Sequence, residues 1–275
     1  GGGTVVLEGT PEDVPAHGVV DYRYVFVKTD YPEDRWVRAL EPRPTATDVT
    51  HHIIVYLQGP DDTERGPFLA GTAPGVPATV YPGGVAKRLP AGAWLMFELH
   101  YTPNGRATRD RSRVGMIFAD GPPEREVRTA WVGTTDFEIP PRAADHEVVA
   151  EHRFRDGGEI LMFLPHMHLR GKAYRYELAR AGGGTEVLLD VPRYDFNWQL
   201  WYMARRPVRV EPGDVLRGVA RFDNSEANPA TPDPTVAVRY GEQSFEEMMF
   251  GFFDWTPDRL RRPARDRLAA VSPPR

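Results

Sequence analysis

The sequence predicts an all-β protein built from two consecutive domains. Of its 275 residues, 26 are Gly and 27 are Pro, about 19% of the chain against the roughly 12% that these types contribute on average. Short runs of β-branched and aromatic residues, bounded by Gly, Pro, Asp or Asn, recur along most of the chain, as is typical of strands joined by turns. A proline-rich break separates two comparable sets of these runs, which indicates two all-β halves.

The first set of runs predicts strands before the break. These runs cover residues 19–27, 49–57, 93–102, 113–119 and 127–133. Between them, residues 59–90 are rich in Pro and Gly, which predicts a long functional or covering loop.

The second set predicts strands after the break. These runs cover residues 146–154, 159–169, 173–180, 185–191, 196–203, 214–222 and 235–240. The one helix that the sequence favours covers residues 257–270, and Pro263 interrupts it.

The break itself is the segment FEIPPRAADHE, residues 137–147. Its adjacent prolines predict a stiff, extended linker. We therefore expect an N-terminal domain over residues 1–140 and a C-terminal domain over residues 141–275.

Composition excludes several classes of function. The net charge is −5 with both signs interspersed, so there is no basic stripe and nucleic acid is not expected as a partner. No apolar run approaches the roughly 20 residues that span a membrane, and no signal-peptide pattern opens this chain. The chain has no cysteine, which excludes disulfides, zinc–thiolate sites, thiol nucleophiles and iron–sulfur clusters.

A first cluster of candidate metal ligands lies in the first half. His51 and His52 are adjacent in an apolar run, and His100 ends another run in ELHYTPNG. Adjacent strand residues point to opposite faces, so His51 and His52 can share a metal only if the strand twists or bulges locally. The alternative places one imidazole in the core and the other in solvent. Three neutral imidazoles suit copper or zinc equally well.

A second cluster lies in FLPHMHLRGK, residues 163–172. On a strand, His166 and His168 point to one face and Met167 to the other, which makes the two imidazoles a bidentate clamp; the alternative is a solvated or core histidine pair beside a turn. In the later segment FEEMMFGFFDW, Met248 and Met249 alternate faces, so one of them can face this cluster. A Met in an aromatic run is normally a core residue, but two histidines with a thioether favour copper that cycles through Cu(I).

With these residues the chain resembles the copper type II, ascorbate-dependent monooxygenases, a family that includes peptidylglycine α-hydroxylating monooxygenase and dopamine β-monooxygenase. The matching segments are HHIIVYL, LHYTPNG, PHMHLRGK, VEPGDVL and EEMMFGFF, which occur in family order between residues 49 and 253. One such motif alone is weak, whereas all five in sequence are specific. The segments RFDNSEANPATPDP and RYGEQSFEEMMFGFFD are most similar to bacterial members.

The resemblance implies a fold and two metal sites. The fold would be two tandem jelly-roll-like antiparallel β-sandwich domains facing a solvent-filled cleft. An electron-supplying copper would be held by His51, His52 and His100. A second copper, where oxygen binds and a substrate C–H bond is attacked, would be held by His166, His168 and Met248. Met248 is preferred to Met249 because the family's acidic-Glu-Met pattern aligns with residues 246–248.

The resemblance also implies partners and a location. Two copper ions per chain would work with O2 and a reductant, either ascorbate or a redox protein, to hydroxylate a small or apolar substrate. Members of this family act outside the cytoplasm, so a periplasmic or secreted location is expected.

Two departures from the family pattern limit this expectation. The animal enzymes contain many disulfides, and this chain has none to form. The peptide-amidating members hold the substrate carboxylate with an Arg two residues before the first His of the pair and a Tyr four residues after the Met ligand. Here those positions are Leu164 and Phe252, so amidation of peptidylglycine is not expected. Arg170 is a substitute anchor if it is not simply a surface residue.

Two other classes of function stay open. The same residues would suit a non-catalytic copper carrier or electron-transfer module, or a purely structural pair of sandwiches. His17, His146 and His152 lie outside the matching motifs and are expected to be surface or strand-facing residues. For Asp195 and Asn197 the alternatives are a place in the wall of the cleft or a hydrogen-bonded strand end.

Overall fold

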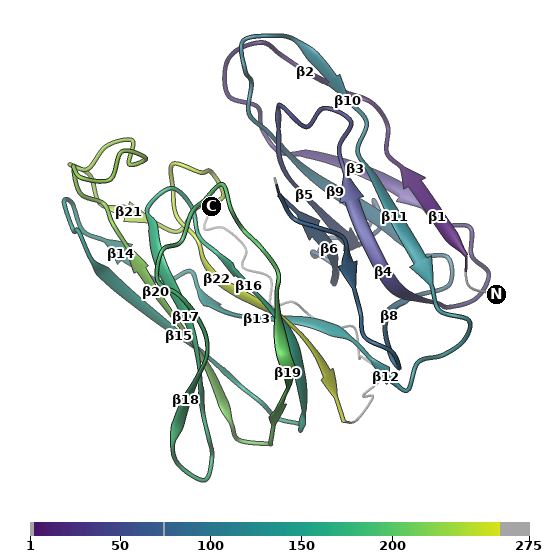
Figure 1. The fold of residues 1–275 in the computed structure, drawn as a ribbon. Coiled ribbons are helices and arrows are strands. Elements are labelled where there is room, and N and C mark those ends of the chain that lie inside the picture. The colour runs from purple at the N-terminus through teal and green to yellow at the C-terminus, as the bar shows by residue number, and fades with distance from the viewer. Residues whose placement is uncertain (1–2, 74, 259–275) are drawn as a thin grey trace. The chain divides into compact units, whose positions relative to one another are not determined.

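The computed structural model describes residues 3–73 and 75–258, and this part of the chain folds entirely as strands, turns and loops. The all-β prediction is confirmed (Figure 1). The chain divides into two compact units, the first up to Thr129 and the second from Ala130. Among the described residues, no helix is long and apolar enough to cross a membrane.

Unit 1 is a β-sandwich of two main sheets. One sheet has the order β1 (Thr4–Glu8), β11 (Arg113–Phe118), β4 (Arg35–Arg43), β8 (Val85–Leu89) and β12 (Arg125–Glu126), with β7 (Thr79–Val80) also paired to β4. The other has the order β3 (Arg23–Lys28), β9 (Trp94–Tyr101), β5 (Thr50–Leu57) and β6 (Phe68–Thr72). A ribbon of β10 (Thr108–Asp110) and β2 (Glu12–Val14) completes the unit.

The core of unit 1 lies between these sheets. β4 contacts both β5 and β6, and side chains from both sheets are fully buried, such as Val37, Val114, Ile53 and Phe97. In β11, buried and half-exposed residues alternate, as expected for a strand with one face on the core. β9 is buried almost throughout and lies between β3 and β5 in its sheet.

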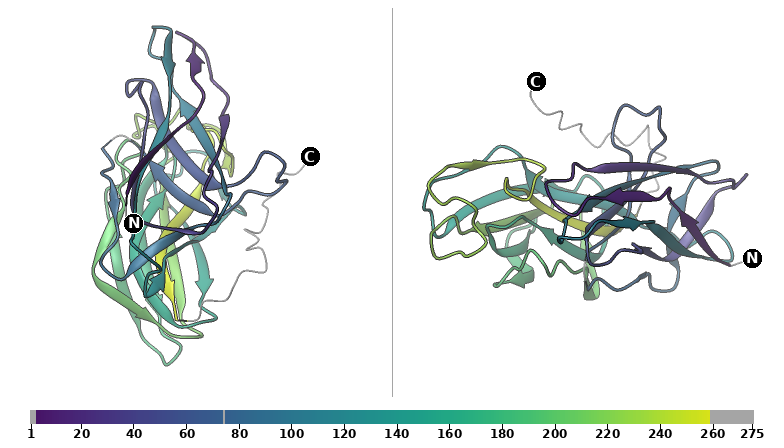
Figure 2. Two further views of the ribbon diagram at one scale, coloured as in Figure 1. Left: turned by 90° about the vertical axis from the view of Figure 1, so that its right-hand side faces the viewer. Right: turned by 90° about the horizontal axis from the view of Figure 1, so that it is seen from above.

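Unit 2 is a second β-sandwich. One sheet has the order β13 (Arg128–Thr134), β22 (Met249–Pro257), β16 (Gly158–His166) and β19 (Tyr202–Val210). The other has the order β15 (His146–Arg153), β20 (Val215–Phe222), β17 (Gly171–Ala179) and β18 (Thr185–Val191). A short ribbon pairs β14 (Glu138–Ile139) with β21 (Val238–Arg239). One core cluster joins both sheets, with Phe163, Phe253, Tyr174 and Phe222 all buried; Figure 2 gives two further views of the strands.

The division between the units falls before the proline pair. We expected it at residues 140/141, but it falls at Thr129/Ala130. The reason is that Ile139, next to Pro140, pairs with Val238 and is fully buried in the core of unit 2. The Pro-Pro segment is therefore part of the second unit.

Two local expectations differ from the structure, and a third lies outside the described residues. Residues 59–90 are not one long loop, because they contain β6, β7 and β8. Strand structure is absent from residues 196–201, which form a turn leading into β19. The helix expected over 257–270 lies outside the described residues, except for Pro257, which ends β22, and Asp258.

Candidate metal centres

A β-bulge brings His51 and His52 to the same place. β5 pairs with β9 so that Thr50 lies opposite Tyr101 and His52 lies opposite His100, with a register shift between Thr50 and His52. His51 is the extra residue in that shift. A bulge of this kind bends a strand and re-aims a side chain, which overcomes the usual alternation of neighbouring residues. The condition that the sequence imposed on a shared metal is therefore met.

The three imidazoles of unit 1 converge. One ring nitrogen from each of His51, His52 and His100 lies within 4.8 Å of the others, and the Nδ1 atoms of His51 and His52 are 3.1 Å apart. Two nitrogens bound at about 2.0–2.1 Å to one metal, at angles between square and tetrahedral, are separated by about 2.9–3.4 Å. The observed spacing therefore fits two nitrogens that share one metal ion. In the described part of the chain, this is the only cluster of three or more His, Asp or Glu residues with such spacing.

Neighbouring side chains hold this cluster in place. The ring of Tyr22 stacks on His100 with a centroid distance of 4.9 Å and an interplanar angle of 19°. The next residue after His100, Tyr101, donates its hydroxyl to Oδ2 of Asp110 at 2.9 Å. Asp110 is itself buried and accepts further hydrogen bonds from Thr45, Ala46 and Ser112. The end of β9 that carries His100 is thus anchored from two sides.

In unit 2, strand register decides which residues share the face of His166. β16 and β22 are antiparallel, with His166 opposite Phe250 and Leu164 opposite Phe252. All four are half-buried, whereas the intervening Gly251 is buried. Residues directly opposite in an antiparallel pair point to the same face, so these four side chains form one surface of the sheet.

Met248 and Met249 differ in burial. The pairing of β16 with β22 ends where His166 lies opposite Phe250. Within β22, Met249 precedes Phe250, so its side chain points to the opposite face; it is fully buried and belongs to the core cluster. Met248 lies one residue before β22 and is half-buried, so its place beside the histidine pair stays a prediction.

The β16 strand ends at His166, yet the two imidazoles of the pair stay together. The ring centroids of His166 and His168 are 5.3 Å apart. Tyr194 clamps the peptide between them: its hydroxyl donates to the Met167 carbonyl at 2.6 Å and accepts the Met167 N–H at 3.0 Å. Gly171 permits this approach, since a Cβ there would lie 2.7 Å from the Tyr194 ring.

Each histidine of this pair has a hydrogen bond at Nδ1. The Nδ1 of His166 lies 2.7 Å from Oε1 of Gln199, and that of His168 lies 3.4 Å from the carbonyl oxygen of Glu246. Both partners are acceptors, so each Nδ1 carries the proton and each Nε2 keeps its lone pair. Burial lowers the pKa of His166, although the Gln199 contact partly opposes the shift; the ring is therefore neutral near pH 7.

The buried carboxylate of Glu247 joins the two ligand-bearing segments. It accepts the backbone N–H of His168 at 2.8 Å, that of Arg170 at 2.6 Å and that of Met248 at 3.3 Å. Burial raises the pKa of Glu247 to about 8, while these N–H donors and the Arg170 charge act in the opposite direction. One side chain thus ties residues 168–170 to residues 247–248.

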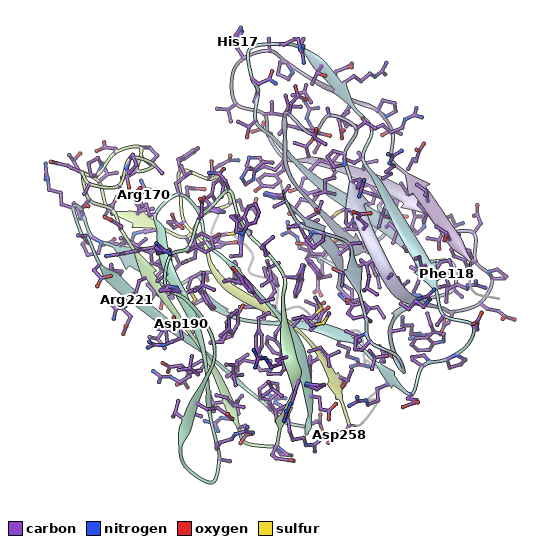
Figure 3. All side chains as sticks on the ribbon, in the orientation of Figure 1. His17, Phe118, Arg170, Asp190, Arg221 and Asp258 are labelled. Carbon is purple, nitrogen blue, oxygen red and sulfur yellow. The ribbon has the colours of Figure 1, made fainter. Side chains whose placement is uncertain are left out.

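Arg170 is not a surface residue, contrary to the simpler sequence interpretation. It is 1% exposed and lies inside unit 2 (Figure 3). Its Nε donates to Oδ1 of Asn224 at 2.8 Å and its Nη1 donates to the Phe245 carbonyl at 2.8 Å. The guanidinium therefore holds loops together and is poorly placed to anchor a substrate.

The residues outside the motifs have ordinary surroundings. His17 is exposed and His146 half-buried, while His152 packs its ring on Phe154 and Phe253 at 5.0 and 5.1 Å. Burial lowers the pKa of His152. Asp195 is exposed and its Oδ1 accepts the backbone N–H of Asn197, which is a local turn contact rather than a ligand position.

Sequence reasoning missed several residues of these centres. Gln199 lies in the predicted strand 196–203 and Tyr194 just before it, while Tyr22 lies in the predicted strand 19–27, ahead of β3. Polar residues spaced 30 or so positions from the histidines have no local signal that marks them as neighbours. Glu247 was noted only as part of a motif, and its buried position comes from tertiary packing.

Comparisons with known proteins do not assign a family. No protein-family model matches the chain, and no curated protein matches it. Among solved structures, it is similar to an allantoicase, with 11% identity over 78% of this chain and 80% of that chain, at a TM-score of 0.23. With the allantoicase of Saccharomyces cerevisiae it shares 9% identity over 88% of this chain and 80% of that chain, at a TM-score of 0.24. With dimeric latent PorU of Porphyromonas gingivalis it shares 10% identity over 82% of this chain and 24% of that chain, at a TM-score of 0.21. At these TM-scores the likenesses support no functional assignment.

Proposed function

We propose that this protein is a copper-dependent monooxygenase that uses O2 and a reductant to hydroxylate a C–H bond of a small apolar substrate. The observation that carries the proposal is the bulged pairing of β5 with β9, which brings three imidazoles to within bonding reach of one ion. A strand bulge that defeats side-chain alternation is a specific device. Packing alone would not require three imidazoles at one point.

The donor types favour copper. Unit 1 offers three imidazoles, a set that suits copper or zinc. Unit 2 offers the Nε2 atoms of His166 and His168, and the thioether of Met248 would complete the set; a thioether favours Cu(I) over zinc. When bound, copper would supply one-electron chemistry and oxygen activation at the unit 2 centre. The reductant would be ascorbate or a redox protein.

The protein's own groups would hold and shield these ions. His51, His52 and His100 would act as neutral ligands, with Tyr22 stacked on His100 to fix its ring plane. In unit 2, Glu247 would keep His168 and Met248 at a constant spacing through backbone hydrogen bonds. Such contacts around the ligand-bearing residues would orient them for the metal.

The surface beside His166 supports an apolar substrate. Leu164, Phe250 and Phe252 share its face, and Trp131 packs edge-on against Phe250 at 5.1 Å. No cation stands at the two positions where the amidating relatives bind a carboxylate, and Arg170 is engaged by Asn224 and Phe245. A periplasmic or secreted location belongs to the same proposal and rests on the family resemblance.

The test begins with metal content. Protein reconstituted anaerobically with Cu(I) should hold two copper ions per chain, and His51→Ala should remove one of them while His17→Ala, an exposed control, removes none. One copper per chain in the wild type, or an equal preference for zinc, would count against the assignment.

The second stage tests catalysis. With ascorbate and small alkylbenzenes as probes, we expect oxygen uptake that depends on the probe, and a hydroxylated product that contains one atom from labelled O2. Two bound coppers that oxidise ascorbate without substrate-dependent uptake would instead indicate the copper carrier or electron-transfer module. If the protein shows no copper binding and no turnover, only the structural role remains.

A further inference from the structure

We infer that Gln199 is a positioning residue that fixes the ring tautomer and orientation of His166, so that Nε2 faces the ligand site. The inference deepens the proposed function, since it concerns how the unit 2 centre is prepared for copper. It also makes a statement about the metal-free protein, which can be tested without copper.

The hydrogen bonds of Gln199 determine which of its atoms faces the histidine. Its Nε2 donates to the carbonyl oxygen of Phe196 at 2.8 Å, and this contact requires the NH2 group on that side. Oε1 is then the atom that lies 2.7 Å from His166 Nδ1. A carbonyl oxygen only accepts, so Nδ1 must be the protonated nitrogen. Nε2 is therefore left as the atom with a free electron pair for a metal.

The turn that carries Gln199 is shaped around the histidine pair. Within residues 194–199, three side chains each reach one residue of the 166–168 tripeptide. Tyr194 binds the Met167 peptide, and Phe196 packs edge-on against the His168 ring at 6.0 Å. Gln199 binds His166. One short segment thus contacts every member of the tripeptide.

Burial makes the Gln199 contact selective. Gln199 is 7% exposed, so water competes weakly for its amide and a lost partner would leave a buried polar group unsatisfied. The turn is also held independently of Gln199, because Asp195 accepts the N–H groups of Asn197 and Trp198. Removing the Gln199 side chain should therefore disturb His166 more than it disturbs the turn.

Three variants separate positioning from a structural role. Gln199→Leu removes the acceptor at nearly constant volume. Gln199→Glu keeps an acceptor for Nδ1–H and serves as the conservative rescue. Asn197→Ala changes an exposed side chain of the same turn and is the matched control.

The first readout is the tautomer of His166 in the metal-free protein, taken from its ring ¹⁵N chemical shifts at pH 8. We expect the Nδ1–H form in the wild type, in Gln199→Glu and in Asn197→Ala. Gln199→Leu should shift the ring toward the Nε2–H form that a histidine side chain prefers in water. An Nε2–H ring in the wild type, or an Nδ1–H ring that persists in folded Gln199→Leu, would overturn the inference.

The second readout is Cu(I) affinity, measured by competition with a Cu(I) chelator. Outer hydrogen-bond partners of ligating histidines typically change metal affinity 10–100-fold. In Gln199→Leu we expect one of the two copper equivalents to bind about 10–100-fold more weakly than in the wild type. In Gln199→Glu we expect the affinity to recover. An affinity unchanged in Gln199→Leu would also overturn the inference. Absence of copper binding in the wild type would instead defeat the proposed function, while the tautomer result would stand on its own.

Discussion

Substitutions of the adjacent Met248 and Met249 are expected to have opposite effects on stability and on copper-dependent activity, and they can be tested as a pair. Met249 is fully buried in the core of unit 2, and a Cβ on Gly218 would lie only 3.2 Å from its Cε. Met249→Leu conserves volume and should cost at most about 1.5 kcal/mol, whereas Met249→Ala leaves a cavity and should cost about 2–5 kcal/mol. Met248 is half-buried, so Met248→Ala should cost only about 1 kcal/mol.

Function should show the reverse order. If the Met248 sulfur binds the copper of unit 2, then Met248→Ala should abolish substrate-coupled oxygen use and leave the copper held by His51, His52 and His100. Met249→Leu should keep activity. The stability of each variant is measured by urea unfolding of the metal-free protein, and the ligand set by X-ray absorption of the Cu(I) form.

The X-ray absorption result decides the case. A Cu–S scatterer that is lost in Met248→Ala and kept in Met249→Leu supports the assignment. If the sulfur signal is absent from the wild type, or disappears with Met249, the choice of Met248 is wrong. A cost of 2–5 kcal/mol for Met248→Ala with unaltered copper would place this residue in the core instead.

Three further predictions follow from the same contacts. Asp110→Ala should destabilise unit 1 by about 2–6 kcal/mol at pH 7, because the buried Ala46 N–H and the buried Tyr101 hydroxyl lose their acceptor at about 1–3 kcal/mol each. Burial alone would raise the pKa of Asp110, but hydrogen bonds from Ala46, Ser112, Tyr101 and Thr45 lower it. Its ionised form therefore stabilises the fold above about pH 4, and this contribution is lost as the pH falls through the lowered pKa. The free energy of unfolding of variant and wild type is compared by urea unfolding at pH 7 and pH 3. A difference as large at pH 3 as at pH 7 would contradict the prediction. Copper binding should weaken below about pH 6, since imidazole must be neutral to coordinate and its free pKa is near 6.5. Because burial lowers the pKa of His166, titration with Cu(II) should show that the unit 2 copper is retained to lower pH than free imidazole would allow. Glycine-extended peptides should not be amidated efficiently, because Leu164 and Phe252 offer no charge or hydroxyl; robust turnover in a product assay would show that another residue anchors the carboxylate.

Most of the fold could be predicted from residue pattern. Runs of β-branched and aromatic residues between turn formers located β5, β9, β11, β15, β18 and β20 within about two residues, since the period of side-chain burial is set by the strand itself. The residue pattern did not predict β4, because its sequence, RWVRALEPR, contains several charged residues and a proline. It is nonetheless a central strand, paired with β11 and β8, and its buried Val37, Ala39 and Leu40 show that tertiary packing overrode the local signal.

The candidate ligands were also visible in the sequence, because histidine and methionine are rare and their spacing on strands is informative. What the spacing left undecided was whether they meet. For His51 and His52, strict alternation predicts opposite faces, and only the register shift against β9 brings them together. For Met248 and Met249, alternation predicts one inward and one outward residue, but only tertiary packing shows that Met249 is the core residue and Met248 the half-buried one.

Sequence by itself determined the strand-rich architecture, the absence of thiol chemistry and the six candidate ligands, because these depend on composition and on contacts within a few residues. The tertiary structure alone decided the supports of those ligands. Gln199 reaches His166 across 33 positions and Glu247 reaches His168 across 79. Arg170, which looks like a surface residue after a strand, is buried by loops that carry Asn224 and Phe245. Such contacts arise from strand order and loop closure, and a local pattern carries no record of which distant side chain will fill a given position.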